Sequence, residues 1–212
     1  MGLFERKLRE KNARREHILN SAKKVFIING YTETTIEKIS MEAELSTATI
    51  YIYFKNKMEL YTELKVDFMN EINEGVEYIY EKKVPPIRKI ELIIEYFIKL
   101  FKKDPFLFMN VIQLQASDDI QKISPELLEK IQESARRLHA VFKNICADGI
   151  REGCFININP VVLADMCWSI FAGMALWERS KSYFDKKKSY FESSIRIATK
   201  IYLRGICAAR AD

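Results

Sequence analysis

The segment LSTATIYIYFKNK, residues 45–57, decides between two fold classes. Thr, Ile and Tyr favour β-strands, and the repeat Ile-Tyr-Ile-Tyr alternates like a strand with one buried face. The segment nevertheless lies between two helix N-cap signals, Ser46 and Asn56, which leave room for about two helical turns. A strand here would have no partner nearby in the sequence, and its backbone N–H and C=O groups would stay unpaired. We therefore predict a short helix that buries Ile50 and Phe54.

Helical patterns lie on both sides of this segment. Apolar residues recur at helical spacing over residues 13–29, and Gly30 is well placed to end that helix. A capping-box pattern at Thr34-Thr35-Ile36-Glu37 begins a brief helix that ends near Glu42. A long helix follows the N-cap at Asn56. Two short helices joined by a turn and preceded by a third helix are typical of a helix-turn-helix unit.

The rest of the chain also has helical periodicity, and several helix starts are marked by proline. The expected helices cover residues 87–103, 106–116, 125 to about 151, 161–181 and about 189–208. We therefore predict an all-α fold. Residues 1–56 form an N-terminal three-helix domain with a basic arm at 1–12, and a long helix joins it to a C-terminal helical domain at 57–212.

Composition excludes several classes of protein. The 212 residues are 48% hydrophobic and 30% charged, which is typical of a globular protein, and 7 Gly with 5 Pro are few for an all-β fold. The longest uncharged run near the C-terminus, residues 166–177, is shorter than the roughly 20 residues that span a bilayer. The charged N-terminus lacks the apolar segment of a signal peptide. We expect a cytoplasmic protein without a membrane partner.

The four cysteines lack the spacing of a metal site. Cys146, Cys154, Cys167 and Cys207 contain no closely spaced pair, so reduced core thiols are favoured over a zinc site. We expect no metal and no cofactor.

Positive charge is concentrated at the N-terminus. Residues 1–24 carry eight Lys or Arg against three Glu, an excess that equals the formal charge of +5 for the whole chain. Such an arm is commonly a solvated tail, but beside a DNA-reading element it would seek phosphates.

Residues 12–65 resemble the DNA-binding domain of the TetR family of transcriptional regulators. The matching residues are Ile18, Leu19, Ala22, Val25, Phe26, Gly30, Tyr31, Thr34, Thr35, Ile39, Ala43, Leu45, Ser46, Tyr51, Tyr53, Phe54, Lys57, Glu59 and Leu60. The resemblance implies a ligand-responsive regulator, with a C-terminal domain for effector binding and dimerisation. Such a regulator would bind a pseudo-palindromic DNA operator as a homodimer, and repression is the expected outcome.

The resemblance also implies which residues contact DNA. Thr35, Tyr51, Tyr53 and Lys57 would meet phosphates, and Thr47, Ala48, Thr49 and Ile52 would lie nearest the base edges. The recognition helix has no Arg, Lys, Asn or Gln, so hydroxyl bonds, thymine-methyl contacts and DNA shape would supply more of the selectivity. For Tyr51 the alternative is an aromatic ring that only packs.

One departure from the family pattern lies in the turn. The family usually has Gly where this chain has Glu44, so we expect a positive φ there at a cost of about 1 kcal/mol.

The C-terminal helices supply candidates for a dimer interface and a pocket. Small residues in 161–181 permit close helix approach, so the last two helices are expected to pair with their copies in a second chain. The effector-pocket candidates are Tyr96, Met109, Gln113, His139, Phe142, Met166, Ile170, Met174 and Trp177. The alternative for each is an ordinary filled core. We expect an apolar or aromatic effector, for which an acyl chain is one candidate.

No enzyme motif competes with this interpretation. His17 and His139 lie in no nucleophile motif, and the Ser21-x-x-Lys24 match to a penicillin-binding protein pattern lacks its partner motifs. A different alternative is a helical adaptor whose helix-turn-helix contacts only protein. It would show no salt-dependent affinity for DNA.

Overall fold

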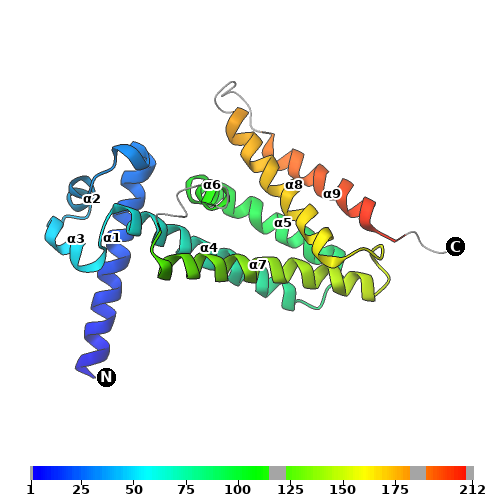
Figure 1. Ribbon diagram of the computed structural model, residues 1–212, viewed down its shortest axis with the longest axis horizontal. Coiled ribbons are helices and arrows are strands. Elements are labelled where there is room, and N and C mark those ends of the chain that lie inside the picture. Colours follow the sequence, from blue (N-terminus) through cyan, green and yellow to red (C-terminus); the bar gives the residue numbers. More distant parts are fainter. Residues whose placement is uncertain (1, 115–122, 182–189, 209–212) are drawn as a thin grey trace. The chain divides into compact units, whose positions relative to one another are not determined.

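The computed structural model describes residues 2–114, 123–181 and 190–208, and these residues form an all-α fold, as predicted. Within them lie nine helices, which Figure 1 labels. They are α1 (Leu3–Glu33), α2 (Ile36–Glu42), α3 (Thr47–Tyr53), α4 (Lys57–Glu81), α5 (Pro86–Lys103), α6 (Pro105–Leu114), α7 (Pro125–Arg151), α8 (Pro160–Lys181) and α9 (Phe191–Ile206). The expected helix limits at 116 and 189 fall outside the described residues.

Segment 47–53 is helical, as the caps around it indicated. The Ser46 hydroxyl accepts a hydrogen bond from the backbone N–H of Thr49 at 3.1 Å, and Asn56 caps α4 through the N–H of Glu59 at 2.8 Å. Ile50 and Phe54 are buried at 0% and 2% exposure. Tertiary packing of these two side chains therefore overrides the local preference for a strand.

Helix α1 begins earlier than the sequence pattern predicted. It starts at Leu3, whereas the apolar spacing indicated residue 13, so the basic arm is helical. Residues 3–12 include Leu, Glu, Arg and Lys, which are good helix formers, but they carry no apolar stripe that would reveal a helix by periodicity. Near its other end α1 is interrupted at Gly30, whose φ of 73° and ψ of 173° suit glycine.

The capping box expected at the start of α2 forms only in part. Thr35 is the N-cap and accepts from the N–H of Lys38 at 3.3 Å. Lys38 therefore occupies the position that a capping-box Glu would need. Glu37 instead bonds its own backbone N–H and the Thr35 hydroxyl, and these two bonds hold the pKa of its carboxyl below the ordinary value. Thr34 is buried, and its hydroxyl donates to the carbonyl of Gly30 at 2.6 Å.

The contacts divide the chain into two compact units. The N-terminal unit runs through Asp67 and includes the start of α7 as far as Glu129. Its core includes Ile18, Leu19, Ala22, Val25, Phe26, Ile36, Ile39, Ala43, Ile50, Phe54, Leu60, Leu64, Val66, Ile123 and Leu127. The C-terminal unit holds the rest, so α4 contributes residues to both.

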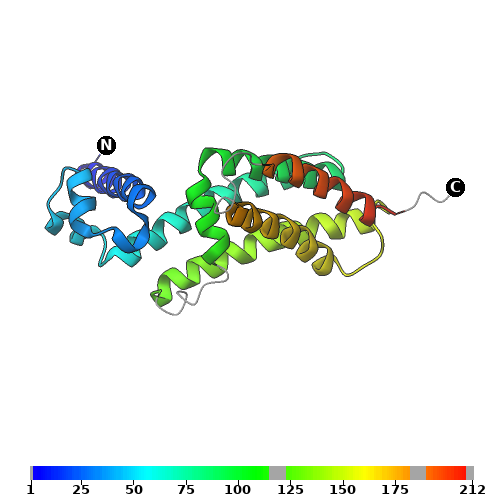
Figure 2. The same cartoon turned by 90° about the horizontal axis from the view of Figure 1, so that it is seen from above.

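Aromatic rings fill the middle of the C-terminal unit. Phe97 of α5 packs against Phe171 of α8 with ring centroids 4.8 Å apart, and Phe108 of α6 lies 5.6 Å from the same ring. Asn73 of α4 is buried and donates to the hydroxyl and carbonyl oxygens of Ser134 in α7 at 2.5 and 3.0 Å. Helices α8 and α9 lie side by side in both views (Figures 1 and 2).

Helix α8 combines length with apolar composition. Among the described residues it alone is long and apolar enough to cross a membrane by those two criteria, with a mean hydropathy of 1.5 over 18 residues. Its inner face nevertheless belongs to the core of the C-terminal unit, where Leu163, Ala164, Cys167, Phe171 and Ala175 are buried. A core helix passes the same test, so length and composition do not identify a membrane span here.

Candidate nucleic-acid interface and ligand pocket

The corner between α2 and α3 is held by backbone contacts on both sides. Leu45 N–H donates to the carbonyl of Ser40 at 2.9 Å, and Glu44 has a φ of 52°, the left-handed conformation that we predicted. The His17 ring on α1 bonds the carbonyl of Ala43 through Nε2 at 2.9 Å. These contacts fix the direction in which α3 leaves the corner.

Helix α3 presents an exposed face opposite its buried one. Tyr51 and Ile52 are 54% and 76% exposed, and Ala48 is exposed beside them. Thr47, Thr49 and Tyr53 are half-buried at the edges of this face. An exposed isoleucine on a short helix costs solvation unless a partner covers it. The face therefore suits contact with another molecule, and its hydroxyl, methyl and phenol groups can bond base edges and phosphates.

Two of the predicted DNA-contacting hydroxyls already have partners within the protein. Thr49 Oγ1 lies 2.9 Å from Ser46 Oγ, and Thr35 Oγ1 caps α2. Each hydroxyl retains further capacity, because an oxygen of this kind can accept two bonds and donate one. Both remain predicted contacts.

Lys57 lies in a different setting from the one that the resemblance implied. Its ammonium donates to the carbonyl oxygens of Tyr31, Thr32 and Thr34 at 2.8, 3.2 and 2.7 Å, and it lies 4.5 Å from the centre of the Tyr31 ring. Three acceptors use all three N–H donors of a lysine. In this structure Lys57 therefore joins the start of α4 to the end of α1, and its phosphate contact stays a prediction.

The C-terminal unit contains an apolar pocket between α7 and α8. Its volume is about 260 Å³, and it is lined by Ala135, Leu138, His139, Phe142, Ala164 and Trp168. His139 Nε2 lies 2.9 Å from Asp165 Oδ1, so the ring is oriented by a carboxylate on the neighbouring helix. Apolar walls with one oriented polar group are typical of a small-molecule site.

Only two of the nine predicted pocket residues line this pocket, namely His139 and Phe142. Tyr96 instead packs against Gly75 and donates to the carbonyl of Glu71 at 2.8 Å. Met109 is buried in α6, and Gln113 accepts from Arg179 Nη1 at 2.6 Å.

The predicted residues of α8 divide between two faces. Met166 and Trp177 are 48% and 63% exposed, and Met174 is half-buried. Ile170 borders a cavity of only about 10 Å³. The apolar stripe was visible in the sequence, but hydrophobicity alone does not tell which neighbour covers each face of a helix.

Sequence reasoning missed Ala135, Leu138, Ala164 and Trp168 as lining residues. A signal was present. Residues 135, 138, 139 and 142 follow the i, i+3, i+4, i+7 spacing that places side chains on one helix face. The partner helix across that face could not be identified from the spacing.

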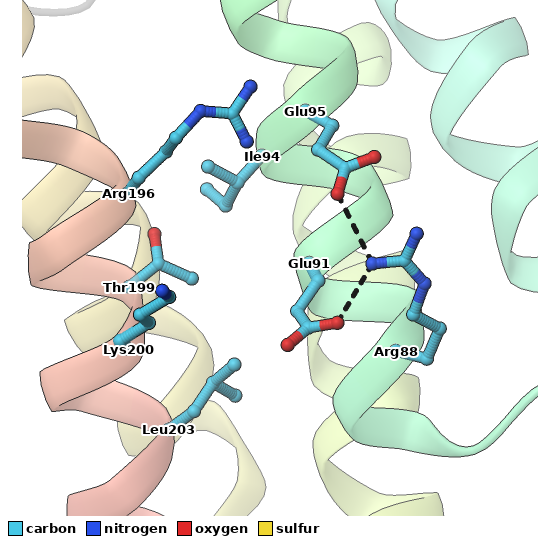
Figure 3. A pocket seen from close by; sticks show the side chains of 8 residues that line it. All are labelled: Arg88, Glu91, Ile94, Glu95, Arg196, Thr199, Lys200 and Leu203. Carbon is cyan, nitrogen blue, oxygen red and sulfur yellow. Dashed lines mark hydrogen bonds and ion pairs between the residues drawn. The ribbon is translucent and has the colours of Figure 1, made fainter. Parts of the chain in front are cut away.

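A second pocket lies between α5 and α9 and has a mixed, largely charged lining (Figure 3). Its volume is about 280 Å³. Arg88 Nη1 bonds Glu91 and Glu95 at 2.9 and 3.2 Å, and these carboxylates raise the pKa of the guanidinium. Arg196 lies across from them and bonds Glu192 at 3.0 Å. Internal ion pairs and an open, solvated form make this pocket a poor site for an apolar effector.

The thiols are free, as predicted, but only two of them are core residues. Cys146 and Cys167 are buried, and burial raises both pKa values, to about 11 for Cys146. Cys154 and Cys207 are partly exposed. Within the described residues no cluster of His, Cys, Asp or Glu could hold a metal ion.

Comparison with known proteins identifies the N-terminal unit. The family model described as "Bacterial regulatory proteins, tetR family" matches residues 18–64, which span the buried part of α1, the corner, α3 and the start of α4. Residues 18–64 therefore carry a DNA-binding domain of the TetR family. The resemblance noted from the sequence is thereby confirmed.

Two relatives that align with most of this chain are also named as regulators. The chain is 26% identical over 175 residues to the HTH-type transcriptional regulator YhgD of Bacillus subtilis (strain 168), covering 82% of this chain and 89% of that protein. It is 28% identical over 146 residues to the fatty acid metabolism regulator protein of the same organism, covering 69% and 73%.

A solved structure shows the same fold. The transcriptional regulator FadR from Bacillus subtilis, in complex with stearoyl-CoA, superimposes with a TM-score of 0.71 at 22% identity, over 90% of this chain and 98% of that one. The family match and the two relatives support a DNA-binding transcriptional regulator rather than an enzyme, and the adaptor interpretation is not favoured.

Proposed function

We propose that this TetR-family regulator is a cytoplasmic repressor that binds a pseudo-palindromic operator as a homodimer and leaves it when an acyl-type effector binds. The exposed face of α3, held by the corner at Glu44 and capped by Ser46, carries the proposal. Ile52 would enter the major groove with Thr47, Ala48 and Thr49, and Tyr51 would bond a phosphate. Thr35 and Tyr53 would bond phosphates.

Exposed apolar side chains on the last two helices support the dimer. Met166 and Trp177 on α8, and Ile197 and Ile201 on α9, are between 48% and 65% exposed. Helices α8 and α9 pack on one another, so these residues can form one surface. A second copy would cover that surface, and two recognition helices one helical turn of DNA apart would match a two-fold site.

The pocket between α7 and α8 supports an effector with an apolar body. Its volume of about 260 Å³ lies just below the range of about 300–1,000 Å³ common for ligand sites. A short apolar group would fit. A long acyl chain would have to push α7 and α8 apart around Leu138 and Trp168. Related regulators concerned with fatty acid metabolism and bound to stearoyl-CoA favour an acyl-CoA as the effector.

Release from the operator would follow from this widening. The effector would stabilise a state of the C-terminal unit in which the pocket is open, and α4, which contributes residues to both units, would couple that state to the recognition helices. A coupling of about 1–3 kcal/mol, or about 5- to 150-fold in affinity, is usual for such linkage.

Selection of random duplex DNA on the purified protein tests the central claim. We expect a two-fold-symmetric site whose affinity falls steeply as the salt concentration rises. Tyr51→Phe should bind that site about 30-fold more weakly and fold normally, because one hydroxyl bond of about 1 kcal/mol is lost from each protomer of the dimer. Tyr78→Phe, which removes an equally exposed hydroxyl from the C-terminal unit, is the control. If no site is enriched at low or high salt, the proposal fails.

The effector claim has its own test. Addition of a long-chain acyl-CoA should release the operator from the wild-type protein, measured by fluorescence anisotropy. Ala135→Trp should fill the pocket and abolish release while operator binding remains. Ala140→Trp on the same helix lies outside the lining residues and should respond normally. Equal release from the wild type and Ala135→Trp would exclude this pocket as the effector site.

A further inference from the structure

The first half of α1 lies outside the folded core of the N-terminal unit. From Phe4 to His17 every side chain is exposed except the half-buried Arg15, and the first buried residue is Ile18. The family match begins at the same position, residue 18. Fifteen helical residues, 3–17, rise about 22 Å. In Figure 1 this blue segment extends past α2 and α3.

A helix of this length without packing contacts is marginally stable in water. The excess of positive charge in this segment is also unusual for the N-terminal end of a helix. Residues 3–17 hold six Lys or Arg and three Glu. Arg6 pairs with Glu10 at 2.8 Å, and Arg15 pairs with Glu63 at 2.7 Å. A segment with these properties gains most from a partner that supplies negative charge along its length.

Three cations of the segment lie on one face. Lys7, Lys11 and Arg14 are spaced by four and three residues, and Ile18 follows after four more, so all four share a side of the helix. Ile18 is fully buried against the rest of the unit. The basic stripe therefore continues the packing face of α1 beyond the end of the domain. None of these three cations forms an ion pair with a residue that the structure describes.

The α2–α3 corner shows where this stripe begins. The bond from His17 to the carbonyl of Ala43 places the corner level with the seventeenth residue of α1. Lys7, Lys11 and Arg14 precede residue 17, so they lie beyond the corner. They are on the same side of α1 as Ile18, which packs against the rest of the unit. If DNA binds against α3, its phosphate backbone would extend past this corner toward the first half of α1.

We propose that residues 3–14 of α1 form a second DNA-binding element, in which Lys7, Lys11 and Arg14 bind backbone phosphates flanking the half-site read by α3. The proposal rests on the proposed operator binding. Each phosphate neutralised releases counterions, so three contacts from each protomer of the dimer add about 5.4 to the slope of log affinity against log salt concentration. This element would raise affinity without adding base recognition.

A triple variant, Lys7→Gln/Lys11→Gln/Arg14→Gln, tests this element in the full-length protein. The matched control, Lys83→Gln/Lys143→Gln/Arg136→Gln, removes the same charge from exposed positions of the C-terminal unit. Each protein is titrated with two duplexes at several salt concentrations. One duplex ends at the edges of the selected operator, and the other adds about ten flanking base pairs on each side.

On the long duplex we expect the triple variant to lose most of this added slope, equivalent to about a thousandfold in affinity over a fourfold change in salt. On the short duplex it should match the wild type, and the control should match on both. Equal affinity and slope on the long duplex would overturn the proposal, and so would an equal loss on both duplexes. Failure of the wild type to select any operator would instead contradict the proposed function.

Amphipathic basic helices also bind anionic membranes, and Phe4 and Leu8 are 79% and 49% exposed. Vesicles containing phosphatidylserine are therefore included. Vesicle binding that the triple variant loses, together with unchanged binding to the long duplex, would assign the segment to a lipid surface and overturn the DNA proposal.

Discussion

Lys57 shows how one side chain can have two competing roles. The family resemblance assigns it to a phosphate, whereas the structure places its ammonium among the carbonyl oxygens of Tyr31, Thr32 and Thr34. The carbonyls of Tyr31 and Thr32 lie near the end of α1, where unpaired carbonyl groups and the helix dipole favour a cation. A lysine held in this way positions α4 against the helix-turn-helix.

The two roles predict different results for Lys57→Met. If Lys57 joins α1 to α4, the free energy of unfolding should fall by about 1–3 kcal/mol, because charged hydrogen bonds are lost. If it binds a phosphate, stability should be unchanged and the salt slope of DNA binding should fall by about two, one for each protomer of the dimer. We expect the first result. Urea unfolding and anisotropy titrations distinguish them, and an unchanged unfolding midpoint would restore the phosphate role.

At the scale of elements, the contact between α7, α8 and α9 contains three buried groups that can ionise. They are Cys146, Cys167 and Tyr202, whose hydroxyl donates to the carbonyl of Leu163 at 2.7 Å. Burial disfavours each charged form, so it raises all three pKa values. The packing of these helices therefore depends on the three groups staying neutral.

Alkaline pH should accordingly destabilise this helix contact. The Cys146 thiol has its pKa raised from 9.0 to about 11, so the folded chain keeps a proton that the unfolded chain loses. The free energy of unfolding should then fall as the pH rises from about 9 toward 11. Between pH 8 and pH 10.5, the free energy of unfolding in urea should fall less for Cys146→Ala than for the wild type. Cys154→Ala should show the same fall as the wild type. Identical pH dependence in all three proteins would show that the raised pKa of Cys146 does not contribute to the loss of stability.

At the scale of the whole molecule, the proposed dimer would bury exposed apolar side chains of α8 and α9. Ile201 is 65% exposed on α9. Its burial by a second copy would be favourable by about 1.5–3 kcal/mol.

Ile201→Glu should therefore produce a monomer that folds but binds the operator weakly, since one recognition helix covers only half of a two-fold site. Light scattering after size exclusion gives the mass, and anisotropy gives the affinity. Ile28→Glu is the control, because Ile28 is 79% exposed on α1, in the other unit. A dimer that persists in Ile201→Glu would move the interface to another surface.

Local chemistry made much of the N-terminal unit predictable. Ser46, Asn56 and Thr35 act as caps through contacts only three residues away, and Glu44 takes the left-handed conformation that the family turn requires. Ile50 and Phe54 are buried as their spacing indicated. Signals of this kind are contained in a few consecutive residues, so they could be read without the rest of the molecule.

Other features depended on residues far apart in the chain. The helical form of residues 3–12 had no apolar stripe to reveal it, and the acceptors of Lys57 come from residues 23 to 26 positions away. The candidate pocket could not be predicted without knowing which helix lies opposite Leu138. That helix is α8, which contributes Ala164 and Trp168 to the lining.

By itself the sequence determined most of the helices, the corner, the TetR-family resemblance of the N-terminal domain and the excess of positive charge at the N-terminus. Only the tertiary structure decided which apolar face of α8 is covered within the chain and which stays exposed. The physical reason is that hydrophobicity shows that a face avoids water, whereas packing against a neighbour determines where that face is buried.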